Sequence, residues 1–475
     1  MRENLFYGYH GKRRTAEEGA AGSPFKDKRV LVMGMARSGI AAAQLLCREG
    51  AQVTVNDRKQ AEEFGDKLDA LRALPIAFRM GEEGPRLLEN QDMLVISPGV
   101  PQDAPLVRAA QEKGMPVLGE LEMASRVLRG SLVAVTGTNG KTTTVSLLGA
   151  IFKEAGKVCY VAGNIGYPLS AAAMESRPED VVVAEVSSFQ LETTSAFHPL
   201  TAAVLNVTED HLNRHGTMEK YTALKRHVFD AQHEGDVAVL NYDDPACRAM
   251  AAGLKGSVAF FSRLQTVDGG AFLRDGRVMI RWQGEEKAVC DAAEIYIPGP
   301  HNLENAMAAA LMAYVCGVPA PVIRHTLRTF KGVEHRIEFV REKDGVRYVN
   351  DSKATNVDST LKAMASMTAP TVLLLGGFDK HVSFAGLAAA VAENRWIDHC
   401  VILGQTGDQI EAALKAAGYD RITRAEDLAQ AVHLARGLAK KGGTVLLSPA
   451  CASFDMFTGF EQRGEVFKSI VNGLT

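Results

Sequence analysis

The amino-acid sequence predicts an α/β protein of three domains, and three observations lead to this prediction. First, 475 residues are more than one hydrophobic core usually organises, and the common domain size suggests about three domains. Second, short runs of β-branched and aliphatic residues alternate with Ala- and Leu-rich stretches of helical period along the chain. Third, glycine-rich turns follow directly after two of the predicted strands. Strands that alternate with helices are typical of parallel sheets with helices packed on their faces.

The first unit begins with a predicted strand at Arg29–Met33, followed by a glycine turn at Gly34–Gly39 and an apolar-periodic helix to about Arg48. Further strands are predicted at Gln52–Val55 and Met93–Ile96. A strand that enters a helix through a glycine turn is the first step of a βαβ unit. The first unit is therefore predicted to be a Rossmann-like domain.

The second unit contains a predicted strand, Leu132–Val135, that runs into the glycine-containing segment Thr136–Thr143. Two more strands are predicted there, at Val181–Val186 and Ala202–Val207. The third unit contains three predicted strands, at Val372–Leu375, Cys400–Leu403 and Thr444–Leu447. We therefore predict a central P-loop ATPase-like parallel sheet and a Rossmann-like C-terminal domain.

The predicted domains span residues 29–118, 119–331 and 332–475. Residues 1–28 are polar, glycine-rich and basic, and we predict that they form a flexible extension. They contain no apolar run, which argues against a secretory signal.

The composition narrows the class of protein. A hydrophobic share of 46% and a charged share of 23% are ordinary for a globular protein. A net charge of -3 gives no basic excess, so we expect no nucleic-acid partner. The seven cysteines are scattered singly, which argues against a disulfide framework and against a zinc site. No segment is long and apolar enough to predict a membrane span, so we expect a cytoplasmic protein and, in addition, a monomer.

The strongest local signal is a phosphate loop between a predicted strand and a predicted helix. Glycines let the backbone N–H groups point at phosphate oxygens, Lys141 adds positive charge, and the Thr142 hydroxyl can reach Mg²⁺. The loop departs from the general Walker pattern, because Val135 stands where that pattern has a glycine. The candidate ATP-binding residues of the loop are Gly137, Thr138, Asn139, Gly140, Lys141, Thr142 and Thr143.

Two neighbouring strand ends carry groups suited to a metal ion. Glu185 ends one predicted strand, and His211 follows another. Because the ends of parallel strands meet at one edge of the sheet, both side chains are expected near the phosphate loop. A carboxylate is a hard oxygen ligand of the kind that Mg²⁺ prefers. A lone acid or histidine is more often structural, but occurrence together with the loop favours a functional role.

The chain resembles the Mur ligase family, the enzymes that build the peptide stem of bacterial cell-wall precursors. The resemblance extends from about Lys28 to the C-terminus, and its motifs occur in the family's order. These motifs are Thr136–Thr142, Glu185–Gln190, Asn206–His211, His301–Asn305, Glu334–Glu338 and Asn350–Asn356.

The resemblance implies an ATP-dependent amino-acid ligase that works through an acyl-phosphate and a tetrahedral intermediate. Two features resemble the branch that adds D-glutamate to UDP-N-acetylmuramoyl-L-alanine: the segment Gly34–Gly39 followed by Asp57, and the tail Ser448–Gly464. That nucleotide-linked acid and D-glutamate are therefore the expected substrates.

The resemblance also implies two Mg²⁺ ions and assigns residues to ATP. Thr142 and Glu185 would hold one ion, and His211 would hold the other with Lys225, which is typically carbamylated in this family. Carbamylation turns an amine into an oxygen donor suited to a hard cation. Arg226 beside Lys225 keeps the exact position open. Asn302, Asn305, Arg336 and Asp351 would contact ATP, and Lys353 would stabilise the transferring charge; with Lys141, Glu185, His211 and Lys225, Lys353 completes the expected catalytic set.

Two further sites follow from the resemblance. The expected UDP-substrate residues are Gly34, Ala36, Arg37, Ser38, Gly39, Asp57, Arg58, Gly99, Asn164, Ser187 and Gln190. The expected amino-acid residues are Thr355, Lys380, Ser453 and Phe460. Phe378 departs from the more polar residue that we associate with the Lys380 loop.

Three alternatives stay open at this point. Another Mur-type or folylpolyglutamate-type ligase would share the phosphate loop and the metal residues. A non-catalytic nucleotide-binding protein would have lost the set of charged residues that this chain retains. An NAD-dependent oxidoreductase is disfavoured, because Ala36 interrupts the dinucleotide fingerprint.

Overall fold

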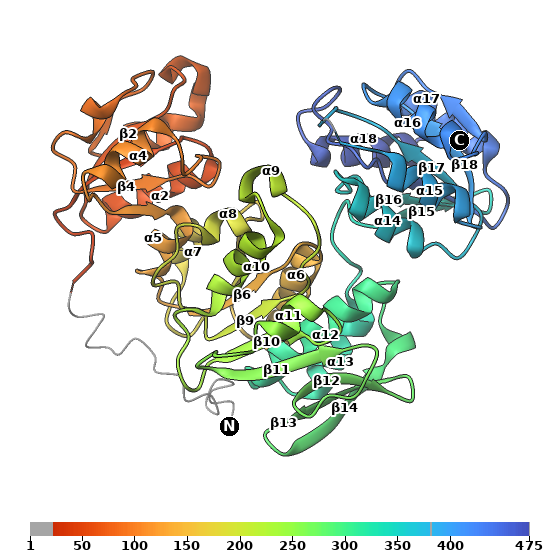
Figure 1. Cartoon of the computed structure of the whole chain (residues 1–475), viewed down its shortest axis with the longest axis horizontal. Helices are drawn as coiled ribbons and strands as arrows, with labels where there is room; N and C mark the ends of the chain where they lie inside the picture. Colours follow the sequence, from red (N-terminus) through yellow and green to blue (C-terminus); the bar gives the residue numbers. More distant parts are fainter. Residues whose placement is uncertain (1–21, 381, 475) are drawn as a thin grey trace. The chain divides into compact units, whose positions relative to one another are not determined.

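The computed structural model describes residues 22–380 and 382–474, which form two compact units (Figure 1). Unit 1 comprises the described residues up to Ile295 together with Glu304–Thr329, and unit 2 comprises Tyr296–Leu303 and the residues from Phe330 onward. Unit 1 contains two sheets and unit 2 contains one. The predicted α/β class with three sheets is confirmed. The exact domain boundaries stay a prediction.

The first sheet has the strand order β3-β2-β1-β4-β5 and is parallel throughout. Its order reverses between β1 and β4, which is the switch point where Rossmann-like sheets bind ligands. Val30 and Val32 of β1 pack with α2, whereas Leu31 packs with α4, so the two helices cover opposite faces. The strands are β1 (Arg29–Met33), β2 (Gln52–Asn56), β3 (Ile76–Phe78), β4 (Met93–Ile96) and β5 (Val117–Gly119). The helices are α2 (Arg37–Arg48), α3 (Asp69–Arg72) and α4 (Pro105–Glu112), with 3₁₀ turns η1 (Ala61–Leu68) and η2 (Pro85–Leu88).

Part of the predicted N-terminal extension belongs to this first core. Residues 1–21 lie outside the described part of the chain. Phe25, which falls within the expected extension, is fully buried and packs in the same cluster as Val30.

The second sheet has the order β14-β13-β12-β11-β10-β9-β6-β8-β7. The segment from β7 to β12 is parallel, as predicted, but β12, β13 and β14 form antiparallel hairpins at one edge (Figure 1). The turns of these hairpins are Asp275-Gly276 and Gln283-Gly284, in which all four residues have positive φ. Such pairs favour tight hairpin turns, so the sequence held a signal that the prediction of parallel strands missed.

The strands of the second sheet are β6 (Ser131–Thr136), β7 (Cys159–Gly163), β8 (Val181–Glu185), β9 (Thr201–Val204), β10 (Val237–Asn241), β11 (Ser257–Ser262), β12 (Gly270–Arg274), β13 (Arg277–Trp282) and β14 (Glu285–Asp291). The helices around it are α5 (Glu120–Ser125), α6 (Lys141–Glu154), α7 (Leu169–Glu175), α8 (Ser188–Leu191), α9 (Leu212–His215), α10 (Met218–Arg226), α11 (Pro245–Ala249), α12 (Pro300–Val315) and α13 (Ala320–Thr329), with 3₁₀ turns η3 (His227–Phe229) and η4 (Ala292–Glu294).

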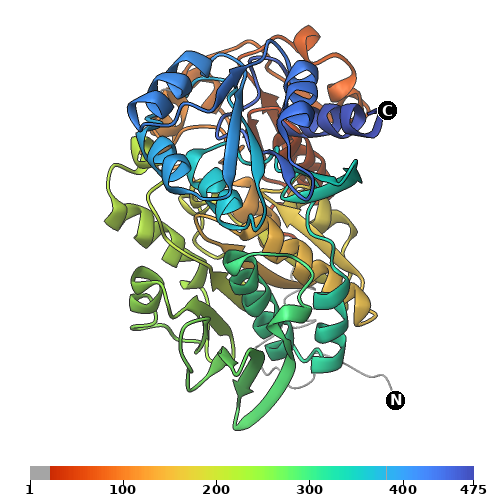
Figure 2. The ribbon, with the colours of Figure 1, turned by 90° about the vertical axis from the view of Figure 1, so that its right-hand side faces the viewer.

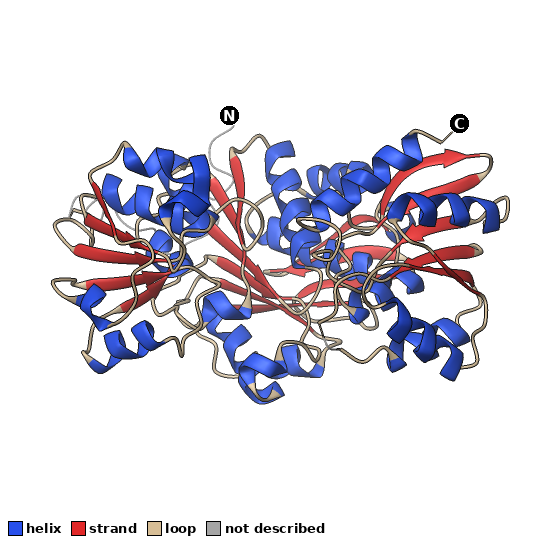
Figure 3. Ribbon diagram, turned by 90° about the horizontal axis from the view of Figure 1, so that it is seen from above, coloured by secondary structure: helices blue, strands red, loops and turns tan. Residues whose placement is uncertain are grey.

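The third sheet, in unit 2, has the order β15-β16-β20-β17-β18-β19. It is parallel except for β15, which forms an antiparallel hairpin with β16. Leu373 packs with α15 on one face and Leu374 packs with α17 and α18 on the other. The alternation explains why helices flank the strands on both sides (Figure 3). Figure 2 shows α18, in dark blue, as the last helix, and it packs beside β15 and β16.

The strands of the third sheet are β15 (Glu338–Lys343), β16 (Val346–Asn350), β17 (Thr371–Leu375), β18 (Ile397–Ile402), β19 (Ile422–Arg424) and β20 (Thr444–Leu447). Its helices are α14 (Val357–Ala365), α15 (Ala385–Glu393), α16 (Gly407–Ala416), α17 (Leu428–Leu438) and α18 (Phe460–Asn472).

Two global features bear on the predictions from composition. All seven cysteines are free thiols. Across residues 22–380 and 382–474, every helix is too short or too polar to cross a membrane.

Candidate active site

The phosphate loop joins β6 to α6 at the carboxyl edge of the second sheet. Gly137 and Gly140 have φ values of 151° and 86°, in a region that favours glycine. A Cβ atom on Gly140 would lie 2.2 Å from Oδ1 of Asn305. The loop therefore requires glycine at this position, and the predicted nucleotide residue Asn305 lies directly against it.

The polar side chains of this loop either bind the loop's own main chain or are buried. Nζ of Lys141 donates to the carbonyl oxygens of Gly137 and Thr138, both at 2.8 Å, so its ammonium lies over the loop. Thr142 and Thr143 are buried, and Oγ1 of Thr143 lacks a hydrogen-bond partner within the protein. Buried polar atoms are almost always partnered, so an orphaned hydroxyl at this position fits a ligand site.

Asn206, which the sequence analysis did not assign to the site, pins the loop to the end of β9. Its Oδ1 accepts from the Asn139 N–H at 2.8 Å, and its Nδ2 donates to the Asn139 carbonyl at 3.1 Å. Thr138 adds a bond from its Oγ1 to the Thr208 carbonyl at 3.1 Å. The Asn206 side chain thus replaces a main-chain pairing and holds the loop rigid.

Glu185 ends β8 beside the phosphate loop, because it pairs with Val135 across the sheet. The side chain is 3% exposed, and its Oε1 accepts from Nδ2 of Asn164 at 3.0 Å. Its Oε2 is buried without a protein partner. A buried carboxylate oxygen in this state matches the hard-oxygen preference of Mg²⁺, so the residues present fit the ion that the resemblance implies.

His211 and Lys225 differ in their surroundings. The His211 side chain is 46% exposed, its φ is 54°, and its ring packs edge-on against Phe189 at 4.8 Å. Lys225 of α10 is 1% exposed, with Nζ 4.4 Å from the centre of the Tyr221 ring. Burial, together with the nearby charge of Lys141, lowers the pKa of Lys225 well below its ordinary value.

The neighbouring Arg226 binds main-chain carbonyl oxygens. Its Nη2 donates to the Ala252 carbonyl at 2.9 Å, and its Nε donates to the Met250 carbonyl. Lys225 is thus the buried member of the pair, and its role as a metal ligand stays a prediction. Tyr221 reinforces the placement, since its hydroxyl lies 3.3 Å from Oγ1 of Thr138 in the phosphate loop.

A cavity of about 400 Å³ opens where the first sheet's switch point approaches the second sheet within unit 1. Asp57 shapes its wall, because its Oδ2 accepts from the Met35 N–H at 2.8 Å. Ser97 closes the other side by donating to the Gly34 carbonyl at 2.7 Å. The lining residues that the sequence analysis had singled out are Gly34, Ala36, Arg37, Ser38, Asp57, Gly99, Asn164 and Gln190.

Three of the expected UDP-substrate residues are not among those lining the cavity. Gly39 serves packing, because a Cβ there would lie 1.8 Å from the Gly34 carbonyl. Arg58 forms an exposed ion pair with Glu83 at 3.3 Å. Ser187 caps α8 by accepting from the Gln190 N–H, and the Gln190 side chain accepts from Ser187 in return.

Unit 2 carries the remaining predicted residues, and Asp351 is the most deeply buried of the titratable ones. It follows β16 and accepts from Oγ of Ser448 at 2.7 Å and from the Ile337 N–H at 3.2 Å. Burial raises the pKa of Asp351 to about 7, partly offset by Ser448 and Arg336. Nε of Arg336 is buried without a protein partner, which is a second orphaned group at a predicted nucleotide residue. Asn302 of α12 is buried and donates to the Pro298 carbonyl at 2.7 Å.

Of the predicted amino-acid residues, Thr355, Lys380 and Ser453 lie on loops of unit 2, and Phe460 is the first residue of α18. Nζ of Lys380 donates to the Thr355 carbonyl at 3.4 Å, which brings those two residues together. Nζ of Lys353 lies 5.1 Å from the centre of the Phe460 ring, and Ser453 is buried. Phe378 is bonded through its N–H to the Ala452 carbonyl, so its loop is tied to the segment that carries Ser453.

Arg463 of α18 is a residue that the sequence analysis missed. It is 2% exposed and donates to neutral oxygens, namely the hydroxyl and carbonyl of Ser352 and the carbonyls of Cys451 and Ala452. It therefore joins the loop after β16, which carries Lys353, to the loop after β20, which carries Ser453. The sequence held no signal for this role, because the burial of Arg463 depends on the two loops that fold over it.

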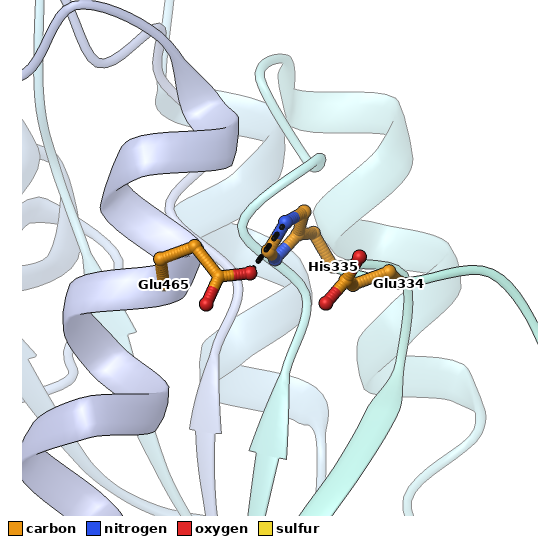
Figure 4. A group of neighbouring side chains, drawn as sticks. All are labelled: Glu334, His335 and Glu465. Atoms are coloured by element: carbon orange, nitrogen blue, oxygen red, sulfur yellow. Dashed lines mark ion pairs between the residues drawn. The ribbon is translucent and has the colours of Figure 1, made fainter.

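Glu334, His335 and Glu465 form a group whose potential ligand atoms lie within 4.8 Å of one another (Figure 4). Lys468 already provides a cation for these carboxylates, since its Nζ pairs with Glu334 and, at 2.8 Å, with Glu465. His335 joins the same group, since its Nε2 lies 3.6 Å from Oε1 of Glu465, and its Nδ1 lies 3.0 Å from Nδ2 of Asn350. The group is thus an internal ion-pair network that fixes α18 to the start of unit 2's sheet.

Comparisons with known proteins cover nearly the whole chain. The Mur ligase MurD-like N-terminal domain matches residues 28–119, the Mur ligase middle domain matches residues 135–313, and the Mur ligase glutamate ligase domain matches residues 335–451. The UDP-N-acetylmuramoylalanine--D-glutamate ligase of Thermoanaerobacter sp. strain X514 is 46% identical over 448 residues, covering 94% of this chain and 98% of its own length. The protein of the same name from Pelotomaculum thermopropionicum is 47% identical over 450 residues, covering 95% and 98%.

Solved structures show the same fold at low sequence identity. A UDP-N-acetylmuramate-alanine ligase from Thermotoga maritima has a TM-score of 0.58 at 18% identity, covering 94% of this chain and 99% of its own. MurF from Acinetobacter baumannii has a TM-score of 0.60 at 17% identity, covering 93% and 94%. With three matched domains and close relatives over almost its full length, the chain belongs to the Mur ligase family.

Proposed function

We propose that this chain is the ligase that adds D-glutamate to UDP-N-acetylmuramoyl-L-alanine at the expense of ATP. The observation that carries the proposal is the identity of 46% and 47% to ligases of that name over 94% and 95% of the chain. The geometry agrees with it, since unit 1 combines an intact phosphate loop with a cavity of about 400 Å³ at the Rossmann-like switch point.

The proposed chemistry has two steps. An oxygen of the substrate carboxylate attacks the γ-phosphorus of ATP, so that an acyl-phosphate forms and ADP leaves. The amine of D-glutamate then attacks the acyl carbon, and the tetrahedral intermediate collapses to an amide with loss of phosphate and a proton. Lys141 over the loop stabilises the negative charge that develops during phosphoryl transfer.

The chain's own residues suit two Mg²⁺ ions. Thr142 and Glu185 would hold one, and His211 and Lys225 the other. The ions would supply charge neutralisation at the phosphates. The orphaned Oε2 of Glu185 supports the first assignment.

Lys225 is proposed to carry a carbamate. Burial lowers the pKa of Lys225, which raises the fraction of its amine in the neutral, nucleophilic form. That amine can add CO₂ and lose a proton, which gives a carbamate with two oxygen donors. A carbamate would replace the buried ammonium by an anion, whose burial the neighbouring Lys141 charge and a bound Mg²⁺ would offset.

The remaining site assignments are part of the same proposal. The cavity residues would bind the UDP moiety, with the turn after Gly34 at the N-terminus of α2 and Asp57 at the end of the neighbouring strand β2. Asn302, Asn305, Arg336 and Asp351 would bind ATP. Thr355, Lys380, Ser453 and Phe460 would bind D-glutamate. A cytoplasmic location is proposed from the seven free thiols, which suit a reducing compartment.

Phosphate release tests the reaction. The full chain is given ATP, Mg²⁺ and UDP-N-acetylmuramoyl-L-alanine, with D-Glu, L-Glu, D-Ala or meso-diaminopimelate in separate reactions. Release only with D-Glu is the expected result. Release with another amino acid would assign a different Mur-type reaction, and no release with any of the four would refute the proposal.

A further inference from the structure

Three polar side chains beside the proposed metal site form a chain of close contacts, a hydrogen bond from Ser188 to His215 and an ion-pair contact from His215 to Glu192, that the reaction described above does not use. Oγ of Ser188 lies 3.0 Å from Nε2 of His215, and Nδ1 of His215 lies 3.3 Å from Oε1 of Glu192. Glu192 is held in turn by Arg214, whose Nε and Nη2 donate to it at 3.2 and 2.6 Å. The chain joins α8 to α9.

The contacts run from serine to histidine to glutamate, as in a hydrolytic triad, but the burial of these residues excludes a role of Ser188 as a nucleophile. Ser188 is 4% exposed and His215 is 5% exposed, so no substrate carbonyl can reach the hydroxyl. A carboxylate only accepts hydrogen bonds, which puts the proton of a neutral His215 on Nδ1 and makes Ser188 donate to Nε2. Burial lowers the pKa of His215, in keeping with the neutral form.

The same residues enclose Phe189, the side chain against which His211 packs. The Arg214 guanidinium lies 4.5 Å from the centre of the Phe189 ring, and the His215 ring lies 5.3 Å from it. The His211 ring contacts the Phe189 ring edge-on at 4.8 Å. His211 itself has a left-handed backbone and a half-exposed side chain, and its ring is restrained by this aromatic contact together with the Asp210 carboxylate, 3.6 Å from its Nε2.

We propose that His215 is a positioning residue that locks α8 against α9 through Ser188 and Glu192 and thereby holds the His211 imidazole ready for a divalent cation. The inference rests on the proposed function only in that His211 takes a metal ion. In this arrangement His215 orients the metal ligand His211 without itself touching the metal ion.

The chain offers a selective change and a matched control. His215→Phe keeps a ring that can stack on Tyr221, which the imidazole does at 5.3 Å, but it removes both polar contacts. His198→Phe is the control, because His198 forms a comparable bond to buried Asp236 at 2.6 Å. His198 precedes β9, whereas His211 and His215 follow that strand. Glu192→Gln is a second test that perturbs the network without changing the volume of the side chain.

Binding of Mn²⁺ is measured by titration calorimetry on each full-length protein with a non-hydrolysable ATP analogue, and thermal unfolding verifies the fold. His215→Phe is expected to weaken Mn²⁺ binding at least fivefold and Glu192→Gln at least twofold, while His198→Phe binds as the wild type does. Wild-type Mn²⁺ affinity in folded His215→Phe, or in Glu192→Gln if the former does not fold, would overturn the proposal. Equal weakening in the His198→Phe control would also overturn it. Phosphate release with D-glutamate by the wild type is recorded on the same preparation, so failure of the proposed reaction is recognised separately.

Discussion

The ammonium nitrogen of Lys225 lies 4.4 Å from the centre of the Tyr221 ring, and both residues are 1% exposed. A cation–π contact contributes about 2 kcal/mol when desolvated, whereas burying an ammonium costs several kcal/mol. Among residues 22–380 and 382–474, no carboxylate forms an ion pair with Lys225, and the more distant charge of Asp210 opposes the effect of burial without outweighing it. The environment therefore favours a neutral or modified lysine.

Replacement of Lys225 by alanine is expected to lower turnover at least a hundredfold, because the second metal site would lose its proposed carbamate. A small carboxylic acid such as formate should restore part of the activity by supplying the missing oxygen donors. Phosphate release with and without added formate measures both effects.

Arg226→Ala provides the matched control, since the neighbouring guanidinium binds main-chain carbonyls instead. That variant should keep activity within about threefold of the wild type and gain nothing from formate. Near-normal activity of Lys225→Ala without any additive would contradict the carbamate.

The Tyr221 hydroxyl is expected to steady the phosphate loop through its contact with Thr138 at 3.3 Å. Tyr221→Phe keeps the aromatic ring under Lys225 but removes this bond, which costs about 1 kcal/mol. The KM for ATP should rise severalfold, while the KM for D-glutamate should stay unchanged. Steady-state kinetics with each substrate varied in turn measure the difference, and equal changes in both constants would argue against a role at the loop.

Sequence patterns predicted the central features because local rules govern them. The strands Arg29–Met33, Met93–Ile96 and Thr444–Leu447 have the bounds that were expected, since buried parallel strands are continuous apolar runs. The phosphate loop could be predicted because its backbone has positive φ at Gly137 and Gly140, where glycine is favoured.

Other parts depend on contacts between distant segments, which no local pattern reveals. The sequence alone predicts Arg463 to be a surface residue of an amphipathic helix, because its burial depends on the loops at Ser352 and Cys451. Asn206 lies in a recognisable motif, but its bonds to Asn139 depend on strand pairing between β9 and β6. The β12–β14 hairpins escaped prediction because the alternation of strands and helices suggested a purely parallel sheet.

Arg463 is expected to be needed for the geometry of the proposed amino-acid site. Arg463→Lys keeps the charge, but a single ammonium cannot reproduce bonds to both Ser352 and Cys451. The KM for D-glutamate should rise at least tenfold, and the midpoint of thermal unfolding should fall. Arg436→Lys is the control, because Arg436 of α17 makes a surface ion pair with Asp344. An unchanged KM in a folded Arg463→Lys protein would show that the two loops keep their positions without the guanidinium.

Asp351 should make stability depend on pH in a direction opposite to that of a salt-bridged aspartate. Its pKa is about 7 in the folded protein, against 3.8 for an ordinary aspartate. Below pH 3.8 both states are protonated, and between that value and pH 7 only the unfolded chain loses its proton. The contribution of Asp351 to stability is therefore present at low pH and is lost as the pH rises to about 7, by up to about 4 kcal/mol.

Urea unfolding at pH 5 and pH 7.5 should show this loss in the wild type and a smaller one in Asp351→Asn. Asp358→Asn, which changes a half-exposed carboxylate of unit 2, should keep the wild-type dependence. The same dependence in Asp351→Asn as in the wild type would show that Asp351 is already ionised at neutral pH, with Arg336 and Arg463 offsetting its burial.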